Sequence, residues 1–498
     1  MIACLVGFRE NSVFGKQRPR WPQRFFCALA LCFLTTTAKA QSASAPSWDG
    51  FYVGANVGLR ATQSKWTGLD FFGPPVPGLE SQTFNDAAFR YGFYAGYNWQ
   101  FAPRWVAGIE GEWGDAQKTR TQPGFLPGFS GIFFGIVPGD TVSVQTNWDA
   151  GLRGRIGYLV TPSTLLYATG GAAWQDFKIT SVCGPSDCGS ETPASAHTTQ
   201  VGWMAGGGIE KMLAGNWLAR AEYRYADFGT SRETLHFGAP IFGTATVDLK
   251  LATSTYVFGL AYRFGGKAPS APQPVAEVPR WSGPYLGLAA GARSREFKWT
   301  TVVGGPFPIL PGVGYEWYND TEFRGGVFAG YNWQFAERFV AGIEGDWGTS
   351  NHTTTQYGAL PGVDGVFGPI NPGDMIRVKT SWDTSARGRI GYLVDPSLLI
   401  YGTGGIAWQH LQVVEACGPL TCGATTSATD TIMAQGWTYG GGIEAAVGGG
   451  WRLRAEYRFA DYGTMRENFS APLLQVPTIA DLMLKTQLVQ FGASYVFN

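Results

Sequence analysis

The chain has 498 residues, of which 45% are hydrophobic, 15% aromatic and only 15% charged, and it contains 70 glycines. So few charges do not suit an ordinary soluble surface, and no apolar run reaches the roughly 20 residues that a membrane-spanning helix needs. Abundant glycine and aromatic residues are instead typical of a transmembrane β-barrel, whose strands curve tightly and whose rings lie at the membrane interface.

Residues 1–40 have the pattern of a secretory signal peptide. Three arginines precede an apolar run over residues 25–34, and Ala38-Lys39-Ala40 places small residues where a signal peptidase cleaves. We therefore expect export and cleavage after Ala40. The remaining chain holds 31 basic and 36 acidic residues, and this balance does not favour nucleic acid as a partner.

Four of the seven cysteines lie beyond residue 40, in two pairs with the same spacing: Cys183 with Cys188, and Cys417 with Cys422. In an exported protein such pairs predict two disulfides. A metal site is the alternative, but it would need further ligands, and none recurs beside both pairs.

The exported part repeats itself with an offset of about 234 residues. GYNWQFA at residue 96 returns at 330, RGRIGYLV at 153 returns unchanged at 387, and RAEYRYADFG at 220 returns as RAEYRFADYG at 454. Between the copies, residues 265–280 hold four prolines, which favour an extended periplasmic linker. The sequence thus predicts one domain over residues 47–264 and a second over residues 281–498.

Each copy contains eight segments in which apolar and polar residues alternate. In the first copy they lie near 50–62, 87–101, 105–119, 142–160, 164–180, 200–213, 217–230 and 250–264. Short turns between them alternate with long loops near 63–86, 120–141, 181–199 and 231–249. This layout predicts an all-β fold, an up-and-down antiparallel barrel of the outer membrane.

One face of these segments is aromatic. Trp148 and Tyr158 share a face and are ten residues apart, which corresponds to about 25 Å along the axis of a tilted barrel. That distance matches the apolar band of an outer-membrane barrel, so we expect this face to contact lipid. In the long loop after the third segment, Phe125, Phe133 and Phe134 would form an exposed adhesive patch or pack on one another.

The opposite face carries charges of both signs. Buried charges are stable only when they are paired and hydrogen-bonded, and an eight-stranded lumen is just wide enough for side chains to fill. We therefore expect an ion-pair network that closes the interior; a line of charges that guides small solutes is the alternative. The expected network comprises Glu110, Glu112, Arg153, Arg155, Glu210, Arg220, Glu222 and Arg224, and in the second copy Glu344, Asp346, Arg387, Arg389, Glu444, Arg454, Glu456 and Arg458.

Several segments together resemble the alphaproteobacterial outer-membrane immunogenic protein family, small porin-like barrels related to the transmembrane domain of OmpA. They include WDGFYVGANVG at residue 48, GIEGEWG at 108, LLYATGGAAW at 165, GWMAGGGIE at 202 and FGLAYRF at 258. The resemblance covers nearly all of the exported chain. It implies eight-stranded barrels in the cell outer membrane, antigenic loops, and a structural or narrow porin-like role. The expected partners are outer-membrane lipid, lipopolysaccharide and the barrel assembly machinery.

Two features depart from the family pattern. One is the tandem copy, which leaves two architectures open: two eight-stranded barrels, which we expect, or one sixteen-stranded diffusion porin. The long linker and the complete set of segments in each copy favour two barrels. The other is the last residue, because barrels of this kind usually end on phenylalanine. Here Phe497 is followed by Asn498, so we expect the assembly signal at Phe497, shifted by one position.

A lipid-modifying enzyme of the outer membrane is the alternative from another functional class. It would need a nucleophile with a positioned base, yet no histidine recurs between the copies. The four histidines are His197, His236, His352 and His410. We expect neither enzymatic activity nor a cofactor, since the glycine motif over residues 402–407 matches a dinucleotide fingerprint only in its letters and no helix is predicted after it.

Overall fold

The structure is a computed structural model. It describes residues 47–497, apart from 72, 76–78, 128, 130–135, 214–215, 240–242, 266–279, 305–307, 359, 364–369 and 471–476. The expected signal peptide and nearly all of the expected linker lie outside the described residues, as do Phe133, Phe134 and Asn498.

Eight long antiparallel strands form the first barrel, each paired with its neighbours in chain order. They are β1 (Gly50–Asp70), β3 (Asp86–Ala102), β4 (Trp105–Pro123), β5 (Thr141–Thr161), β6 (Thr164–Cys183), β7 (Thr192–Met212), β8 (Trp217–His236) and β9 (Thr244–Arg263). The ring closes where β1 pairs with β9, from Tyr52 opposite Arg263 to Asp70 opposite Thr246. A three-residue strand, β2 (Ser81–Thr83), pairs with β1, and a short helix, α1 (Pro185–Cys188), lies between β6 and β7.

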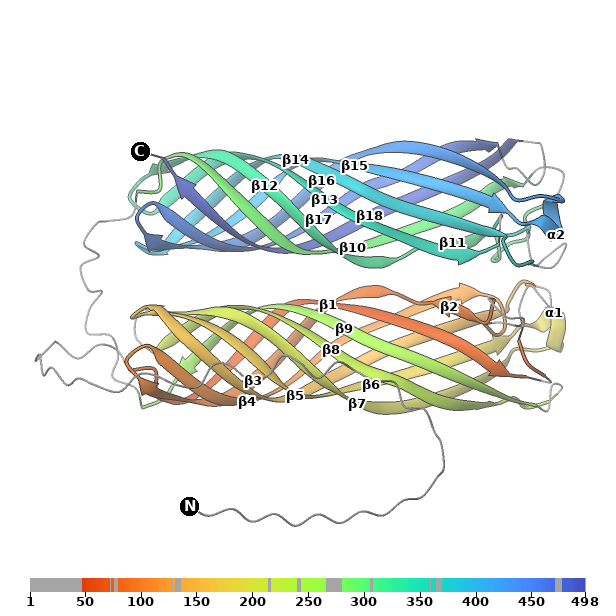
Figure 1. Cartoon of the computed structure of the whole chain (residues 1–498), viewed down its shortest axis with the longest axis horizontal. Helices are drawn as coiled ribbons and strands as arrows, with labels where there is room; N and C mark the ends of the chain where they lie inside the picture. Colours follow the sequence, from red (N-terminus) through yellow and green to blue (C-terminus); the bar gives the residue numbers. More distant parts are fainter. Residues whose placement is uncertain are drawn as a thin grey trace, which may run out of the picture. The chain divides into compact units, whose positions relative to one another are not determined.

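The second barrel repeats this arrangement. Its long strands are β10 (Gly283–Gly304), β12 (Asp320–Phe335), β13 (Phe339–Tyr357), β14 (Met375–Asp395), β15 (Leu398–Cys417), β16 (Thr426–Gly448), β17 (Trp451–Ser470) and β18 (Pro477–Val496). The strand β11 (Tyr315–Trp317) and the helix α2 (Pro419–Cys422) correspond to β2 and α1. Because β18 pairs with β10 and β9 pairs with β1, the strands close as two separate rings (Figure 1). The prediction of two eight-stranded barrels is confirmed, and a single sixteen-stranded barrel is excluded.

Each barrel has a turn end and a loop end. At the turn end, connections such as Pro103-Arg104 between β3 and β4 span only two residues, whereas the connections at the loop end are long. In outer-membrane barrels the short turns face the periplasm and the long loops face the cell exterior. Among the described residues, no helix has the length and apolar character needed to cross a membrane.

The strands extend further toward the loop end than the sequence predicts. β1 continues to Asp70 and β4 to Pro123, where the sequence predicts loops from residues 63 and 120. Beyond the lipid-facing rings, outward positions become polar and the contrast between the two faces weakens. The inward positions remain apolar, with Trp66 on β1, Val142 on β5 and Ile179 on β6 all buried, so the ladder continues past the membrane.

The alternation of side chains places the aromatic face outward. Exposed rings gather near both ends of the apolar band, for example Trp113 and Trp203 toward the loop end and Trp105 and Trp217 toward the turn end. Trp105 lies opposite Tyr158 on β5, with ring centroids 5.3 Å apart. These rings have the placement of the two aromatic girdles of a membrane barrel.

Candidate functional site

The interior of the first barrel holds a network of ion pairs contributed by four strands. Glu110 on β4 contacts Arg153 on β5, and its second oxygen lies 2.6 Å from Arg220 Nη1 on β8. Arg155 on β5 approaches Glu210 on β7 at 3.2 Å. All eight residues expected from the sequence lie together here and are buried, and we call them, with the corresponding eight of the second copy, the central charge layer.

The second barrel repeats the central charge layer almost position by position. Arg387 lies 2.5 Å from Glu344 and 3.2 Å from Glu456, and Arg454 lies 2.5 Å from the other oxygen of Glu344. Arg389 contacts Glu444 at 2.9 Å. The layer therefore crosses the lumen in both copies. Six of its eight acids are shared between arginines on different strands, whereas Glu210 and Glu444 each pair with one arginine.

Buried tyrosines complete the hydrogen bonding of this layer. Tyr52 Oη on β1 donates to Glu110 at 2.7 Å, and Tyr285 Oη donates to Glu344 at 2.8 Å. On β15, Tyr401 Oη donates to Glu456 at 2.7 Å, while the guanidinium of Arg389 lies over its ring at 4.0 Å. A buried carboxylate with several donors avoids the large cost of an unpaired charge, which explains how so many charges remain in one lumen.

A second group of charges lies closer to the loop end, and its residues are not among those predicted from the sequence. In the first barrel, Asp149 on β5 accepts from Arg60 on β1 at 2.8 Å and from Arg90 on β3 at 2.5 Å. Arg90 also approaches Glu112 at 3.1 Å, which joins this group to the central charge layer. We call it the outer charge layer.

The outer charge layer of the second barrel has an additional acid. Arg324 lies 2.6 Å from Asp383, and Arg293 contacts Asp383 as well as Glu322 on β12, the latter at 2.5 Å. Gln409 Oε1 also accepts from Arg293 at 2.6 Å. The first barrel has Ala88 at the position of Glu322, and there Arg60 donates to the backbone oxygen of Ala116 at 2.7 Å.

The sequence contains a signal for these missed residues. Arg60 recurs as Arg293 and Arg90 as Arg324, each on the inward face of its strand. Glycine makes room for the second of these recurring arginines. A Cβ atom at Gly114 would overlap the guanidinium of Arg90, and one at Gly348 would overlap that of Arg324. An inward arginine that recurs opposite a recurring glycine is thus the pattern that could have identified the outer charge layer.

Small cavities lie at the boundary between the two layers. In the first barrel, Glu112, Asp149 and Arg224 line a space of about 20 Å³. In the second barrel, a space of the same volume lies beside Asp383 and Arg458. This volume is enough for about one water molecule and is far too small for a metabolite.

An apolar cluster fills the first barrel at its loop end. Phe71 after β1 and Phe125 after β4 have ring centroids 5.5 Å apart, and Phe237 after β8 lies 4.9 Å from Phe125. Trp66 and Phe129 are buried in the same cluster. Phe125 is only 4% exposed, so this residue packs against its neighbours and forms no exposed patch. In the second barrel, Trp299 and Phe469 occupy the corresponding cluster with centroids 4.6 Å apart.

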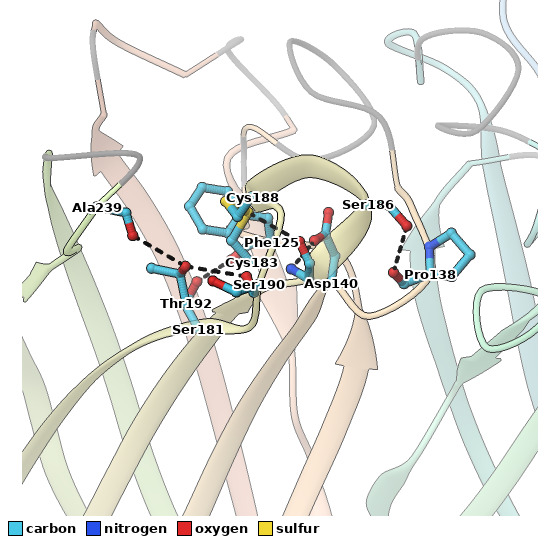
Figure 2. Close-up of a disulfide and its surroundings, with 11 residues drawn as sticks. Phe125, Pro138, Asp140, Ser181, Cys183, Ser186, Cys188, Ser190, Thr192 and Ala239 are labelled. Carbon is cyan, nitrogen blue, oxygen red and sulfur yellow. Dashed lines mark hydrogen bonds between the residues drawn. A yellow bond between two sulfur atoms is a disulfide. The ribbon is translucent and has the colours of Figure 1, made fainter.

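Each copy carries a disulfide across its short helix at the loop end. Cys183 is joined to Cys188 and Cys417 to Cys422. In Figure 2, Ser181 and Asp140 connect this segment of the first barrel to the loop between β4 and β5, since Ser181 Oγ donates to the backbone oxygen of Phe125 and Gly184 N donates to Asp140 Oδ1 at 2.7 Å. The disulfide helix is thus hydrogen-bonded to a second loop.

Asp140 lies in this loop, outside the strands. Burial raises the pKa of Asp140 to about 6, a rise that the nearby Asp187 carboxylate reinforces and the hydrogen bond from Gly184 opposes. Its Oδ2 has no hydrogen-bond partner among the described residues. The corresponding Asp374 accepts on Oδ2 from Thr421 Oγ1 at 2.6 Å, because Thr421 stands where the first copy has Asp187.

The histidines do not gather into one site. His197 lies 2.9 Å from Asp176 on the outside of the first barrel, and His352 contacts Asp320 in the second. His410 Nδ1 lies 2.6 Å from Ser381 Oγ on the outward face of β14 and β15. Within the described part of the chain, no group of three or more His, Cys, Asp or Glu side chains is placed to hold a metal ion.

A family model for the outer membrane protein beta-barrel domain matches residues 27–264 and, a second time, residues 268–497. The chain belongs to this family. Both copies are outer-membrane β-barrel domains, and the protein lies in the cell outer membrane, in contact with membrane lipid.

Proteins with similar sequences include outer-membrane proteins of Brucella and Rhizobium. The 31 kDa outer-membrane immunogenic protein of Brucella melitensis is 31% identical over 205 residues, which are 39% of this chain and 77% of that protein. The 22 kDa outer membrane protein of Rhizobium leguminosarum is 32% identical over 38% of this chain and 68% of its own. The 25 kDa outer-membrane immunogenic protein of Brucella abortus is 29% identical over 46% of this chain and 86% of its own. Each relative is thus matched by about one copy.

Among solved structures, Ail, the attachment invasion locus protein of Yersinia pestis, is 16% identical over 44% of this chain and 100% of its own, with a TM-score of 0.23. The toluene transporter TodX of Pseudomonas putida is 12% identical over 91% of both chains, with a TM-score of 0.26. Both similarities are too weak to indicate a function.

Proposed function

We propose that the protein is a structural and antigenic component of the outer membrane, which displays its loops at the cell surface and allows at most a narrow passage of small solutes. The observation that carries this proposal is the buried central charge layer, in which six of the eight acids are shared between arginines of different strands. The apolar clusters at the loop ends and the water-sized cavities support it.

Conductance in planar lipid bilayers tests whether the lumens are closed. Two barrels filled with ion-paired side chains should give no steps or small, brief ones, whereas steps of nanosiemens size would contradict the proposal. The double variant Glu110→Ser with Arg153→Ser removes one acid and one base from the central charge layer, so the net charge of the lumen is unchanged. It should increase the conductance. The matched control is Arg232→Ser with Asp248→Ser, which removes an exposed pair of the same chemistry and should leave the conductance unchanged.

Display of the loops is tested on intact cells. The names of the Brucella relatives describe immunogenic proteins, which supports a role for the loops as antigens. An epitope inserted after Gly189, beside the first disulfide, should bind antibody on intact cells. The same epitope inserted at Pro162, in a turn at the opposite end, should bind only after the outer membrane is permeabilised; binding at Pro162 on intact cells would contradict the proposed orientation.

Insertion by the barrel assembly machinery is part of the same proposal, with Phe497 as its recognition residue. The Phe497 ring is exposed, its centroid lies 5.3 Å from that of Tyr495, and its backbone N–H donates to Pro284 O at 2.9 Å. Phe497→Ala should lower the amount of heat-modifiable protein in the outer membrane, while deletion of Asn498 should not. An unchanged yield of Phe497→Ala would contradict this role.

A further inference from the structure

The outward face of β14 carries two basic residues just beyond the aromatic girdle of the second barrel. Trp382 belongs to that girdle, and Lys379 and Arg377 follow it toward the loop end. Arg377 and Lys379 are two residues apart on a strand, so both point away from the lumen on the same face. The buried Ile376 and Val378 between and beside them point inward.

These two cations lack the acidic partner that Arg466 and Arg232 have on the outward faces of their barrels. Arg466 forms two hydrogen bonds with Asp481, at 2.7 and 2.8 Å, and Arg232 pairs in the same way with Asp248. Within the described residues, no carboxylate lies within 4.0 Å of Arg377 or Lys379. Their neighbours across the ladder are neutral: Thr353, Thr355, Gln412 and Val414. The face therefore carries a net positive charge.

Polar side chains extend this face toward the girdle. A register shift between Thr380 and Asp383 turns Ser381 and Trp382 outward together. Ser381 Oγ lies 2.6 Å from His410 Nδ1, and the His410 ring stacks on Trp382 with centroids 5.6 Å apart. A hydroxyl and an imidazole therefore lie between the two cations and the lipid-facing ring.

Lys379 lies at the depth of the lipid headgroups, and Arg377 lies a few ångströms beyond them. At about 3.3 Å per residue and a tilt of roughly 40°, Lys379 lies about 8 Å beyond Trp382 along the barrel axis and Arg377 about 13 Å. The headgroup region extends for roughly 5 to 8 Å beyond the hydrocarbon, and lysine and arginine side chains are long enough to turn their charges into it.

From this placement we propose that Arg377 and Lys379 form a binding site for the phosphate groups of an outer-leaflet glycolipid, the lipid A part of lipopolysaccharide. Arginine and lysine are the residues that bind phosphate, and here no internal carboxylate competes for them. The pair of cations belongs to the second barrel. The first copy has Ser143 and Gln145 at these positions and only a single cation, Lys178, opposite Gln145. Binding of lipid A at this outer face does not depend on whether the lumens conduct.

The first copy supplies the test variant. Arg377→Ser with Lys379→Gln introduces side chains that the equivalent strand already carries, so the barrel should still fold, and heat-modifiable migration checks this. The purified full-length chain is titrated with diphosphoryl lipid A in detergent, with inorganic phosphate as a separate probe. The variant should bind lipid A more weakly, by roughly fivefold for each charge removed, and the loss should shrink at high salt.

Two further variants make the result specific. Arg377→Lys with Lys379→Arg keeps both charges and should retain the lipid A affinity within about twofold. Arg466→Ser with Asp481→Ser removes a paired cation of the same barrel and should also leave the affinity unchanged. The proposal is overturned if Arg377→Ser with Lys379→Gln binds lipid A as well as the unaltered protein, if the Arg466 control loses as much, or if inorganic phosphate alone saturates the site at equal phosphate concentration.

Discussion

The two barrels use the same central charge layer and different outer charge layers. In the central layer, seven of the eight positions keep their residue type, and the eighth exchanges Glu112 for Asp346. In the outer layer, the first barrel places Arg60 between Asp149 and a backbone oxygen, whereas the second places Arg293 among Asp383, Glu322 and Gln409.

This contrast shows where a buried charge network tolerates change. Glu110 and Glu344, at the middle of the central charge layer, each have three arginine partners, so a single substitution there would leave more than one arginine uncompensated. In the outer charge layer, one acceptor of Arg60 is a backbone oxygen. The second copy has Glu322 at the position of Ala88, and this glutamate adds an acceptor without removing one. The outer charge layer can therefore change while the central charge layer is retained.

Removal of a central acid should give the largest effect, and an equal one in both barrels. Glu110→Gln leaves Arg153, Arg155 and Arg220 short of a carboxylate and should destabilise the first barrel by about 3–5 kcal/mol. Glu344→Gln should cost the second barrel the same. The measurement is the temperature of heat-modifiable migration and the urea midpoint of the full chain. Asp248→Asn breaks an exposed ion pair and is the control; it should change the midpoint far less than either central substitution. A clear difference between Glu110→Gln and Glu344→Gln would refute the equivalence of the two central layers.

The outer charge layers should respond unequally to the same substitution. Asp149 is the only carboxylate within 4.0 Å of Arg60 among the described residues, whereas Arg293 keeps Glu322 when Asp383 is removed. Asp149→Asn should therefore destabilise its barrel by about 1–2 kcal/mol more than Asp383→Asn destabilises the other. Addition of Ala88→Glu to Asp149→Asn should recover part of the loss. Equal midpoints for the two single variants in urea would contradict the difference between the layers.

The turn that joins the second and third long strands also differs between the copies. In the second barrel, Ala336 and Glu337 have positive φ angles of 47° and 58°, a conformation that costs residues with a Cβ atom about 1 kcal/mol each. Ala336→Asn with Glu337→Gly supplies residues that favour this conformation and should stabilise the second barrel by about 1 kcal/mol or more. The first barrel has Pro103 at the position of Glu337, and proline cannot adopt a positive φ. Pro103→Gly is accordingly expected to destabilise the first barrel. A higher thermal midpoint for this variant would show that the turn of the first barrel also favours a residue with a positive φ angle.

The smallest expected effect concerns pH and the loop beside each disulfide. Since the pKa of Asp140 is raised to about 6, the folded loop favours the protonated acid; this contribution is complete below about pH 4 and is lost as the pH rises through 6. Limited proteolysis of the loop before β5 should therefore accelerate across this range and level off above it.

The second copy indicates how to remove this pH dependence. Asp187→Thr introduces the hydroxyl that Thr421 provides to Asp374 and removes a neighbouring carboxylate, so it should lower the pKa of Asp140 and shift the change in proteolysis to lower pH. Asp140→Asn should abolish the change. A proteolysis rate that depends on pH in the same way in all three proteins would rule out Asp140 as its origin.

The alternation of residues and the repeat were enough to predict two closed eight-stranded barrels with an aromatic exterior. Both are local properties: a strand buries every second residue, and a copied set of eight strands can close on itself wherever its first and last strands pair. Trp105 and Tyr158, which the alternation places on the lipid-facing side, are exposed and in contact. The extent of the strands was less predictable, because Ser and Thr replace the outward rings beyond the membrane.

The pairing of charges across the lumen was decided only by the tertiary structure. Arg60 on β1 and Asp149 on β5 are 89 positions apart on strands that do not pair, and they meet because the ring closes with a particular stagger between its strands. The burial of Phe125 depends likewise on Phe71 and Phe237, which reach the loop end from other strands. Alternation tells which residues face inward, but the height at which each strand presents them is set by the closure of the barrel, and a linear pattern does not contain it.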